Sequence, residues 1–244
     1  MNPADQKQMA APAGAQLIRD EFGQFYGGNF EIRHRDTNTI LILNLQGEVH
    51  AKPGTMISYT QGVVIRGTFH FTFKNIFTGD QTAYLHLRGP GQATLSNHGL
   101  GDIIVLYMNN SQWITNRNAF LCMTDGIQRD SKAQSIGKTF MSGAGLWVHH
   151  YTGTGTLFLE TFGAILFQDL QPGENYFIHH HFVVAWNCQY GVETIKAEGG
   201  FFSKLATGDF WMCRFTGPGR VYFQSKSADV FGEWISPYIP QKGN

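Results

Sequence analysis

A glycine motif that returns twice at one fixed spacing constrains this fold more than any other feature of the sequence. Three nine-residue segments align without gaps: L-R-G-P-G-Q-A-T-L at 87–95, Y-T-G-T-G-T-L-F-L at 151–159 and F-T-G-P-G-R-V-Y-F at 215–223. Successive copies stand 64 residues apart (153 − 89 and 217 − 153). Such recurrence at one period indicates internal repetition. The repeated glycines are Gly89 and Gly91, Gly153 and Gly155, and Gly217 and Gly219.

The residues around each copy are typical of β-strands. An apolar residue precedes the glycines and alternating apolar residues follow them, as a strand, a tight turn and a second strand require. Glycine supplies the turn conformations, and Pro90 and Pro218 fix φ at a turn position. A phosphate-binding glycine loop needs a helix after the glycines, so that alternative is disfavoured.

A second block recurs ahead of the glycines, beginning at Gly47, Ser111 and Gly173. Its alignment sets residues 179–181 against 53–55 and 117–119. We therefore predict one all-β domain over 29–235, with three tandem repeats at about 29–106, 107–168 and 169–235. A flexible leader is expected at 1–28 and a tail at 236–244. Because small β-units leave open edges, the three repeats are expected to pack into a single closed body.

Composition narrows the classes of function. The 18 Lys and Arg residues balance the 18 Asp and Glu residues, so no long-range field favours nucleic acid. Cys122, Cys188 and Cys213 are far apart and lack the C-x-x-C spacing of zinc sites or a disulfide framework. No apolar run reaches the length of a membrane span. The leader lacks the composition of a transit or signal peptide, which favours an intracellular, cytoplasmic protein.

Three consecutive histidines, at 179–181, raise the question of a metal site. In a strand, His179 and His181 would share one face while His180 points to the other. We expect ordinary strand histidines, because the sequence around them does not supply the carboxylate and second histidine of a cupin. The alternative is a cupin-like metal site in which His179 and His181 join His149, His150 or His86.

The glycine alignment also superposes His86, His150 and Arg214, each three residues before the first glycine of its copy. Around a pseudo-threefold axis these nitrogen donors could meet as an anion-binding ring. We favour an outer face exposed to water.

Other sites are weakly indicated. Phe201 and Phe202 follow two glycines and form a candidate exposed patch for a partner or a membrane surface. The sequence contains no nucleophile elbow, zinc-protease helix or nucleotide-binding loop. We therefore expect no cofactor and no catalytic residues.

With these segments in place, the chain resembles the altered-inheritance-of-mitochondria protein 24 family over about residues 28–235. The resemblance is carried by L-Q-G-E at 45–48, P-G-T-M-I-S-Y at 53–59, T-G-T-G-T-L-F-L at 152–159 and above all C-R-F-T-G-P-G-R-V-Y-F-Q-S at 213–225. It implies a fold similar to the tryptophan RNA-binding attenuation protein. Three short double-stranded β-helix or sandwich units would then surround a pseudo-threefold axis.

The resemblance implies no catalytic residues, and it links fungal members to mitochondrial organisation. We therefore expect a non-enzymatic scaffold that binds a protein partner or itself, with peripheral membrane contact and a mitochondrial location as further expectations. One alternative is the cupin-like metal protein. The other is binding of a small ligand or RNA at the junctions between repeats.

Overall fold

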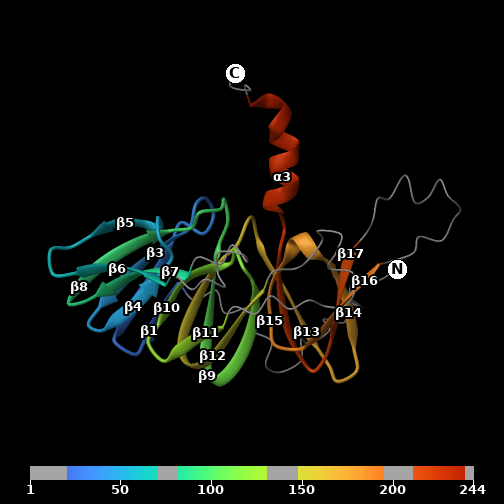
Figure 1. Cartoon of the computed structure of the whole chain (residues 1–244), viewed down its shortest axis with the longest axis horizontal. Helices are drawn as coiled ribbons and strands as arrows, with labels where there is room; N and C mark the ends of the chain where they lie inside the picture. Colours follow the sequence, from blue (N-terminus) through green and yellow to red (C-terminus); the bar gives the residue numbers. More distant parts are fainter. Residues whose placement is uncertain (1–20, 71–81, 131–147, 195–210, 240–244) are drawn as a thin grey trace, which may run out of the picture.

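The computed structural model describes residues 21–70, 82–130, 148–194 and 211–239. Within these residues the chain consists of antiparallel strands and, near its end, one short α-helix, so the predicted all-β class is correct. In Figure 1 the strands form the body, and α3 (Ala228–Ile235) projects upward from the middle of its upper side.

The described strands form three sheets. A five-stranded sheet has the order β1-β2-β3-β8-β5, with bounds Phe22–Phe25, Gly28–Arg33, Ile40–Leu45, Gly91–Ser96 and Met56–Tyr59. A three-stranded sheet has the order β14-β17-β16, with bounds Asn175–His179, Trp211–Thr216 and Gln189–Thr194.

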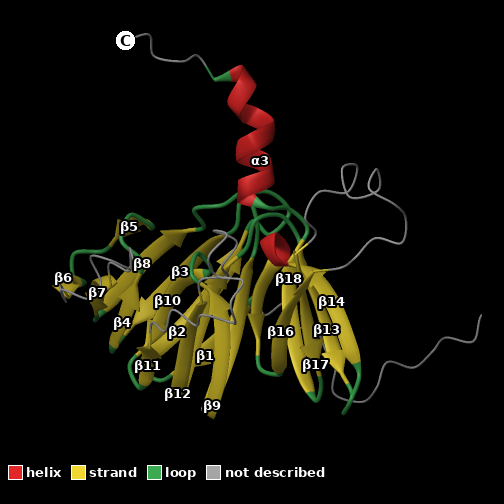
Figure 2. Ribbon diagram, turned by 45° about the vertical axis from the view of Figure 1, so that its right-hand side comes forward, coloured by secondary structure: helices red, strands yellow, loops and turns green. Residues whose placement is uncertain are grey.

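The largest sheet, of ten strands, connects the other two. Its order is β13-β18-β15-β9-β12-β10-β4-β7-β6, and β11 (Ile127–Asp130) pairs with β12. In the same order the bounds are Ile165–Leu170, Gly219–Gln224, Val183–Trp186, Ile103–Asn116, Val148–Glu160, Phe120–Thr124, Glu48–Ala51, Thr82–Arg88 and Val64–His70. Figure 2 shows the strands side by side, with loops gathered at the end near α3.

Alternation of side chains explains why these segments form strands. In β3, I-L-I-L-N-L, the side chains of Leu41, Leu43 and Leu45 are buried at 0–1% exposure, while the residues between them face outward. The described residues contain three buried apolar clusters. The first combines residues of the five-stranded and ten-stranded sheets, the second draws on the ten-stranded sheet, and the third combines residues of the three-stranded and ten-stranded sheets. Phe158, Trp113 and Trp186 are large buried aromatic side chains of the first, second and third clusters.

Two of the three copies of the glycine motif lie where the chain passes from one sheet to another. Gly89 lies between β7 of the ten-stranded sheet and β8 of the five-stranded sheet, and Gly217 lies between β17 of the three-stranded sheet and β18 of the ten-stranded sheet. The middle copy is different, because β12 continues through it with a register shift between Gly153 and Gly155.

The first glycine of each copy approaches the backbone of a neighbouring turn. A Cβ at any of these glycines would lie 2.1–2.3 Å from a carbonyl oxygen, closer than any side chain tolerates. The three pairs are Gly89 with Leu45 O, Gly153 with Gly126 O, and Gly217 with Gln171 O. Glycine is therefore required at all three positions for the same steric reason.

Two boundaries differ from the expectations. Strand β1 begins at Phe22, inside the predicted leader, because Phe25 is buried and its ring packs edge-on against Phe158 with centroids 6.4 Å apart. The last predicted repeat ends in the helix α3, not in a strand. The Ser227 hydroxyl caps this helix by accepting from the Val230 amide at 3.4 Å.

Candidate functional site

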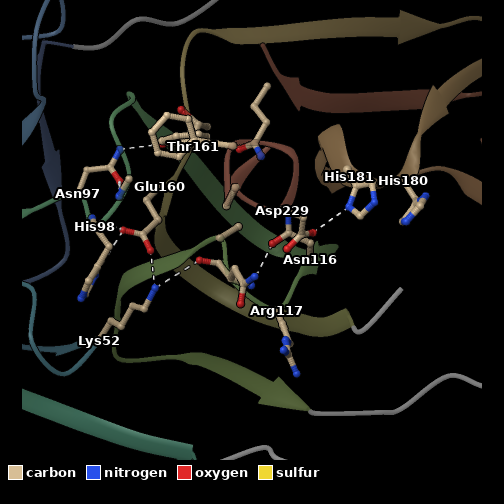
Figure 3. A pocket seen from close by; sticks show the side chains of 17 residues that line it. Lys52, Asn97, His98, Asn116, Arg117, Glu160, Thr161, His180, His181 and Asp229 are labelled. Atoms are coloured by element: carbon tan, nitrogen blue, oxygen red, sulfur yellow. Dashed lines mark hydrogen bonds and ion pairs between the residues drawn. The ribbon is translucent and has the colours of Figure 1, made fainter. Parts of the chain in front are cut away.

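A cleft of about 550 Å³ opens at the end of the body next to α3. It is lined by the ends of strands and by the loops that follow them: Lys52 after β4, residues 97–99 after β8, residues 116–119 after β9 and residues 160–162 after β12. The 3₁₀ helix η2 (His180–Phe182), Gln224 and α3 complete the lining (Figure 3).

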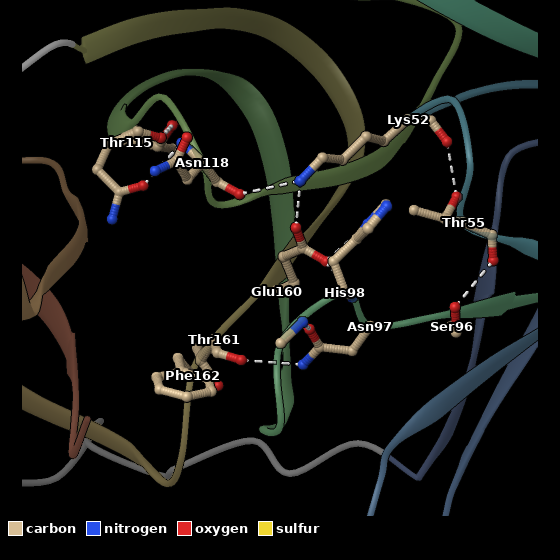
Figure 4. Close-up of polar contacts among 12 residues, drawn as sticks. Lys52, Thr55, Ser96, Asn97, His98, Thr115, Asn118, Glu160, Thr161 and Phe162 are labelled. Atoms are coloured by element: carbon tan, nitrogen blue, oxygen red, sulfur yellow. Dashed lines mark hydrogen bonds and ion pairs between the residues drawn. The ribbon is translucent and has the colours of Figure 1, made fainter. Parts of the chain in front are cut away.

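Glu160 is a buried carboxylate in the wall of this cleft, with 7% of its surface exposed. One carboxylate oxygen forms an ion pair with Lys52 Nζ, and the other accepts from the backbone amide of His98 at 2.8 Å (Figure 4). A buried carboxylate with a cation and an amide donor is satisfied. Glu160 therefore holds two loops together and is not a free acid or base.

Two asparagines fix the remaining loops. Asn97 Nδ2 donates to Thr161 O at 3.0 Å, and its Oδ1 accepts from the Gly99 amide at 2.7 Å. Asn116 Nδ2 donates to Val183 O at 2.5 Å, and its Oδ1 accepts from the Asn118 amide at 2.9 Å. Two of these bonds join segments far apart in the sequence and two fix the conformation of a single loop, so the cleft wall is preorganised.

Helix α3 forms one rim of the cleft. His181 Nδ1 lies 2.8 Å from Asp229 Oδ2, and the Phe162 ring meets the Phe231 ring edge-on at 5.4 Å. From Phe231 the aromatic contacts continue to Trp234, with ring centroids 5.8 Å apart. The helix is therefore joined to the cleft by one polar and one aromatic contact.

The expected alternation of the three histidines is wrong. Strand β14 ends at His179, and the next residues turn into η2, so all three imidazoles lie together, with ring centroids 3.9–5.1 Å apart. Burial, and then the neighbouring imidazoles of His180 and His181, lower the pKa of His179.

The donor atoms of these histidines lie within 4.8 Å of one another, which is compatible with a metal. The ring planes are inclined to one another by 26–36°. His181 also contacts Asp229 on α3.

The three donors aligned by the glycine repeat occupy different environments. His86 Nδ1 lies 2.7 Å from Glu48 Oε1, and Arg214 Nε donates to Glu193 Oε1 at 2.5 Å. His150 lies 3.2 Å from the Gln112 amide and is buried at 8% exposure, so an outer face exposed to water does not describe it.

Several expectations concern other parts of the chain. Phe201 and Phe202 lie outside the described residues. Of the helices in the described ranges, none is long and apolar enough to cross a bilayer.

No sequence motif pointed to Lys52 or Glu160 as residues of the cleft. The alignment of the repeated block did set residues 117–119 against 179–181, and both of these segments contribute to the cleft wall.

Comparisons with known proteins concern most of the chain. A family model described as mitochondrial biogenesis AIM24 matches residues 30–226. An uncharacterized protein of Streptococcus pyogenes serotype M6 is 27% identical over 212 residues, which span 81% of this chain and 85% of that protein. An X-ray crystal structure of a Streptococcus pyogenes protein has a TM-score of 0.68 and 24% identity, covering 86% of this chain and 99% of its own. That likeness concerns the fold alone.

Proposed function

Because the chain belongs to the mitochondrial biogenesis AIM24 family, we propose a non-enzymatic interaction protein that binds a small anionic molecule in the cleft beside α3. The observation that supports this proposal is that the residues of the cleft wall come from all three predicted repeats. Every segment predicted as a repeat contributes to it: Lys52 and 97–99 from the first, 116–119 and 160–162 from the second, and His180, His181 and Gln224 from the third.

This distribution supports the finer architecture expected from the sequence. Three short double-stranded β-helix or sandwich units around a pseudo-threefold axis would bring equivalent loops to one end of the body, and the cleft would lie on that axis. Binding sites commonly form at such junctions, where several elements enclose one concave surface.

The chemistry of the wall favours an anion. The charges of Lys52 and Glu160 neutralise each other, and Asp229 faces His181. Arg117 lines the cleft and is exposed, so its guanidinium is accessible to a ligand. Together with the imidazole donors and the amides of the wall, a guanidinium suits a carboxylate or phosphate group.

Ligand binding in the cleft would act on a partner through helix α3. Trp234 and Tyr238 near the C-terminus are 63% and 74% exposed, which offers an apolar surface to a protein partner or a second copy of the chain. A ligand that displaces Phe162 would shift Phe231 and hence Trp234 through their ring contacts. An intracellular location, cytoplasmic or mitochondrial, and peripheral membrane contact belong to the same proposal.

The test is a thermal-shift screen of small carboxylates and phosphates, followed by calorimetry of the best compound. A ligand at about 100 times its Kd stabilises the folded state by about 2.7 kcal/mol. Arg117→Glu is expected to weaken binding at least about tenfold, since it replaces attraction by repulsion. Arg66→Glu, an exposed arginine on β6, is the matched control. The proposal fails if no compound raises the melting temperature, or if both variants weaken binding equally.

The interaction role needs its own measurement. Light scattering after size exclusion, pull-down and lipid flotation are expected to show self-association, a protein partner or lipid binding that Trp234→Ala reduces. A chain that stays monomeric and unbound in all three assays contradicts this role.

A metal at His179 and His181 is the second candidate, favoured by the proximity of three imidazoles and Asp229. Elemental analysis of untagged protein tests it. A stoichiometric metal that disappears in His179→Asn/His181→Asn would establish this candidate. RNA binding at the repeat junctions predicts salt-sensitive retention of RNA, and its absence would exclude that role.

A further inference from the structure

A group of titratable side chains away from the cleft gathers on one face of the ten-stranded sheet. Glu48 and His50 are two residues apart on β4, so both point away from the face on which Ala51 is buried. His86 on β7 is the direct cross-strand partner of His50. Asp125 reaches the group from the turn after β10, where its Oδ1 lies 2.5 Å from His50 Nε2.

The donor atoms of this group converge. One ligand atom from each of Glu48, His50 and His86 lies within 4.8 Å of the others, and His86 Nδ1 is 2.7 Å from Glu48 Oε1. The two imidazole rings are 4.5 Å apart and inclined at 80°. The group combines these two imidazoles with two carboxylates, Glu48 and Asp125, that already contact them.

Tetrahedral zinc, with bonds of about 2.0–2.2 Å to nitrogen and oxygen, places its ligand atoms roughly 3.4 Å apart. Side-chain rotations of small amplitude would therefore close the group around an ion. Asp125 is best placed to adjust, because its side chain is 62% exposed and the next residue, Gly126, has φ of +88°.

The surroundings favour binding as well. The side chains of His50 and His86 are only 18% and 20% exposed, and the Tyr84 ring lies 5.9 Å from the His50 ring. Shielded imidazoles with carboxylate partners are held in orientation and are protected from competing water.

We propose that Glu48, His50, His86 and Asp125 bind one divalent transition-metal ion of the zinc class. Two imidazoles and two carboxylates suit zinc, cobalt and nickel better than magnesium or calcium, which prefer oxygen ligands alone. The ion would replace protons now shared between the imidazoles and carboxylates, so its binding releases protons. It would tie together β4, β7 and the turn between β10 and β11.

The experiment uses the full chain, stripped with a chelator and titrated with zinc chloride by calorimetry. One equivalent is expected to bind and to raise the melting temperature, and cobalt chloride is expected to give the visible absorption of a tetrahedral site. His50→Gln/His86→Gln should weaken zinc binding about a hundredfold, and Asp125→Asn about tenfold. The melting temperature of each variant without metal reports whether it folds.

His179→Asn/His181→Asn is the control variant that separates this site from the second metal candidate at residues 179–181, and zinc at the proposed site is expected to keep its wild-type affinity in this variant. The proposal is overturned if the wild-type chain binds no equivalent of zinc. It is equally overturned if the control variant loses zinc while His50→Gln/His86→Gln keeps it. If His50→Gln/His86→Gln fails to fold, Asp125→Asn is the deciding test, because this side chain is exposed. An unchanged affinity of Asp125→Asn for zinc would then contradict the proposed set of ligands. None of these results depends on ligand binding in the cleft.

Discussion

Replacement of the first repeat glycines by alanine tests the steric role assigned to them. A methyl group at Gly89, Gly153 or Gly217 would lie 2.1–2.3 Å from a backbone carbonyl oxygen. Ordinary carbon–oxygen contacts begin near about 3.3 Å, so the backbone must move by roughly 1 Å. Overpacking of this kind costs about 1–3 kcal/mol. For a chain of this size each kcal/mol lowers the melting temperature by about 2–4 °C, so a loss of roughly 2–12 °C is expected.

Gly67→Ala is the control for this series. Gly67 lies in β6, and a Cβ there would meet no atom within 4 Å. Alanine at such a position is expected to be neutral or slightly stabilising, because it restricts the unfolded chain. Thermal unfolding followed by circular dichroism compares the four variants. The steric argument is refuted if any of the three repeat variants melts like wild type, or if Gly67→Ala loses as much stability as they do.

Three further predictions concern ionisable groups. Asp102, at 4% exposure, forms an ion pair with Arg35, so Asp102→Ala is expected to cost about 3–5 kcal/mol in urea unfolding; a loss below 1 kcal/mol would contradict this. Burial, and then its histidine neighbours, lower the pKa of His179 below 6.5. As the pH falls below that value, the unfolded chain takes up a proton at this residue before the folded chain does, so the free energy of unfolding decreases. Urea unfolding between about pH 7.5 and pH 5.5 should show this loss reduced in His179→Asn, and an unchanged pH dependence would contradict it. Burial raises the pKa of Cys213 to about 12 and that of Cys122 well above its usual value, so iodoacetamide should modify both thiols slowly until urea is added; rapid reaction of the folded protein would disprove their burial.

The glycine period was the most informative part of the sequence because it depends on local sterics. Where the backbone must approach a neighbouring carbonyl oxygen, only glycine fits, so glycine recurs at the same position in every copy. Gly89 and Gly217 lie between strands of different sheets. The alternation of apolar residues in segments such as β3 likewise reports burial directly. Both signals are local, which is why the all-β class could be predicted.

The candidate sites depend on register and loop conformation, which the sequence does not display. His50 and His86 are adjacent only because β4 and β7 pair in one register, although the E-x-H spacing of Glu48 and His50 already placed that pair on one face. The cluster around His179 arises because β14 ends there and a 3₁₀ turn follows. For α3, the cap Ser227 and the apolar spacing after it were available signals that the prediction of a third β-repeat overrode.

A crystal structure with the tightest-binding small carboxylate or phosphate would locate the proposed binding site. The ligand is expected in the cleft beside α3, with its anionic group against the guanidinium of Arg117 and within reach of the loops at 97–99 and 160–162. A ligand seated elsewhere, such as against the outer face of the ten-stranded sheet, would contradict this expectation.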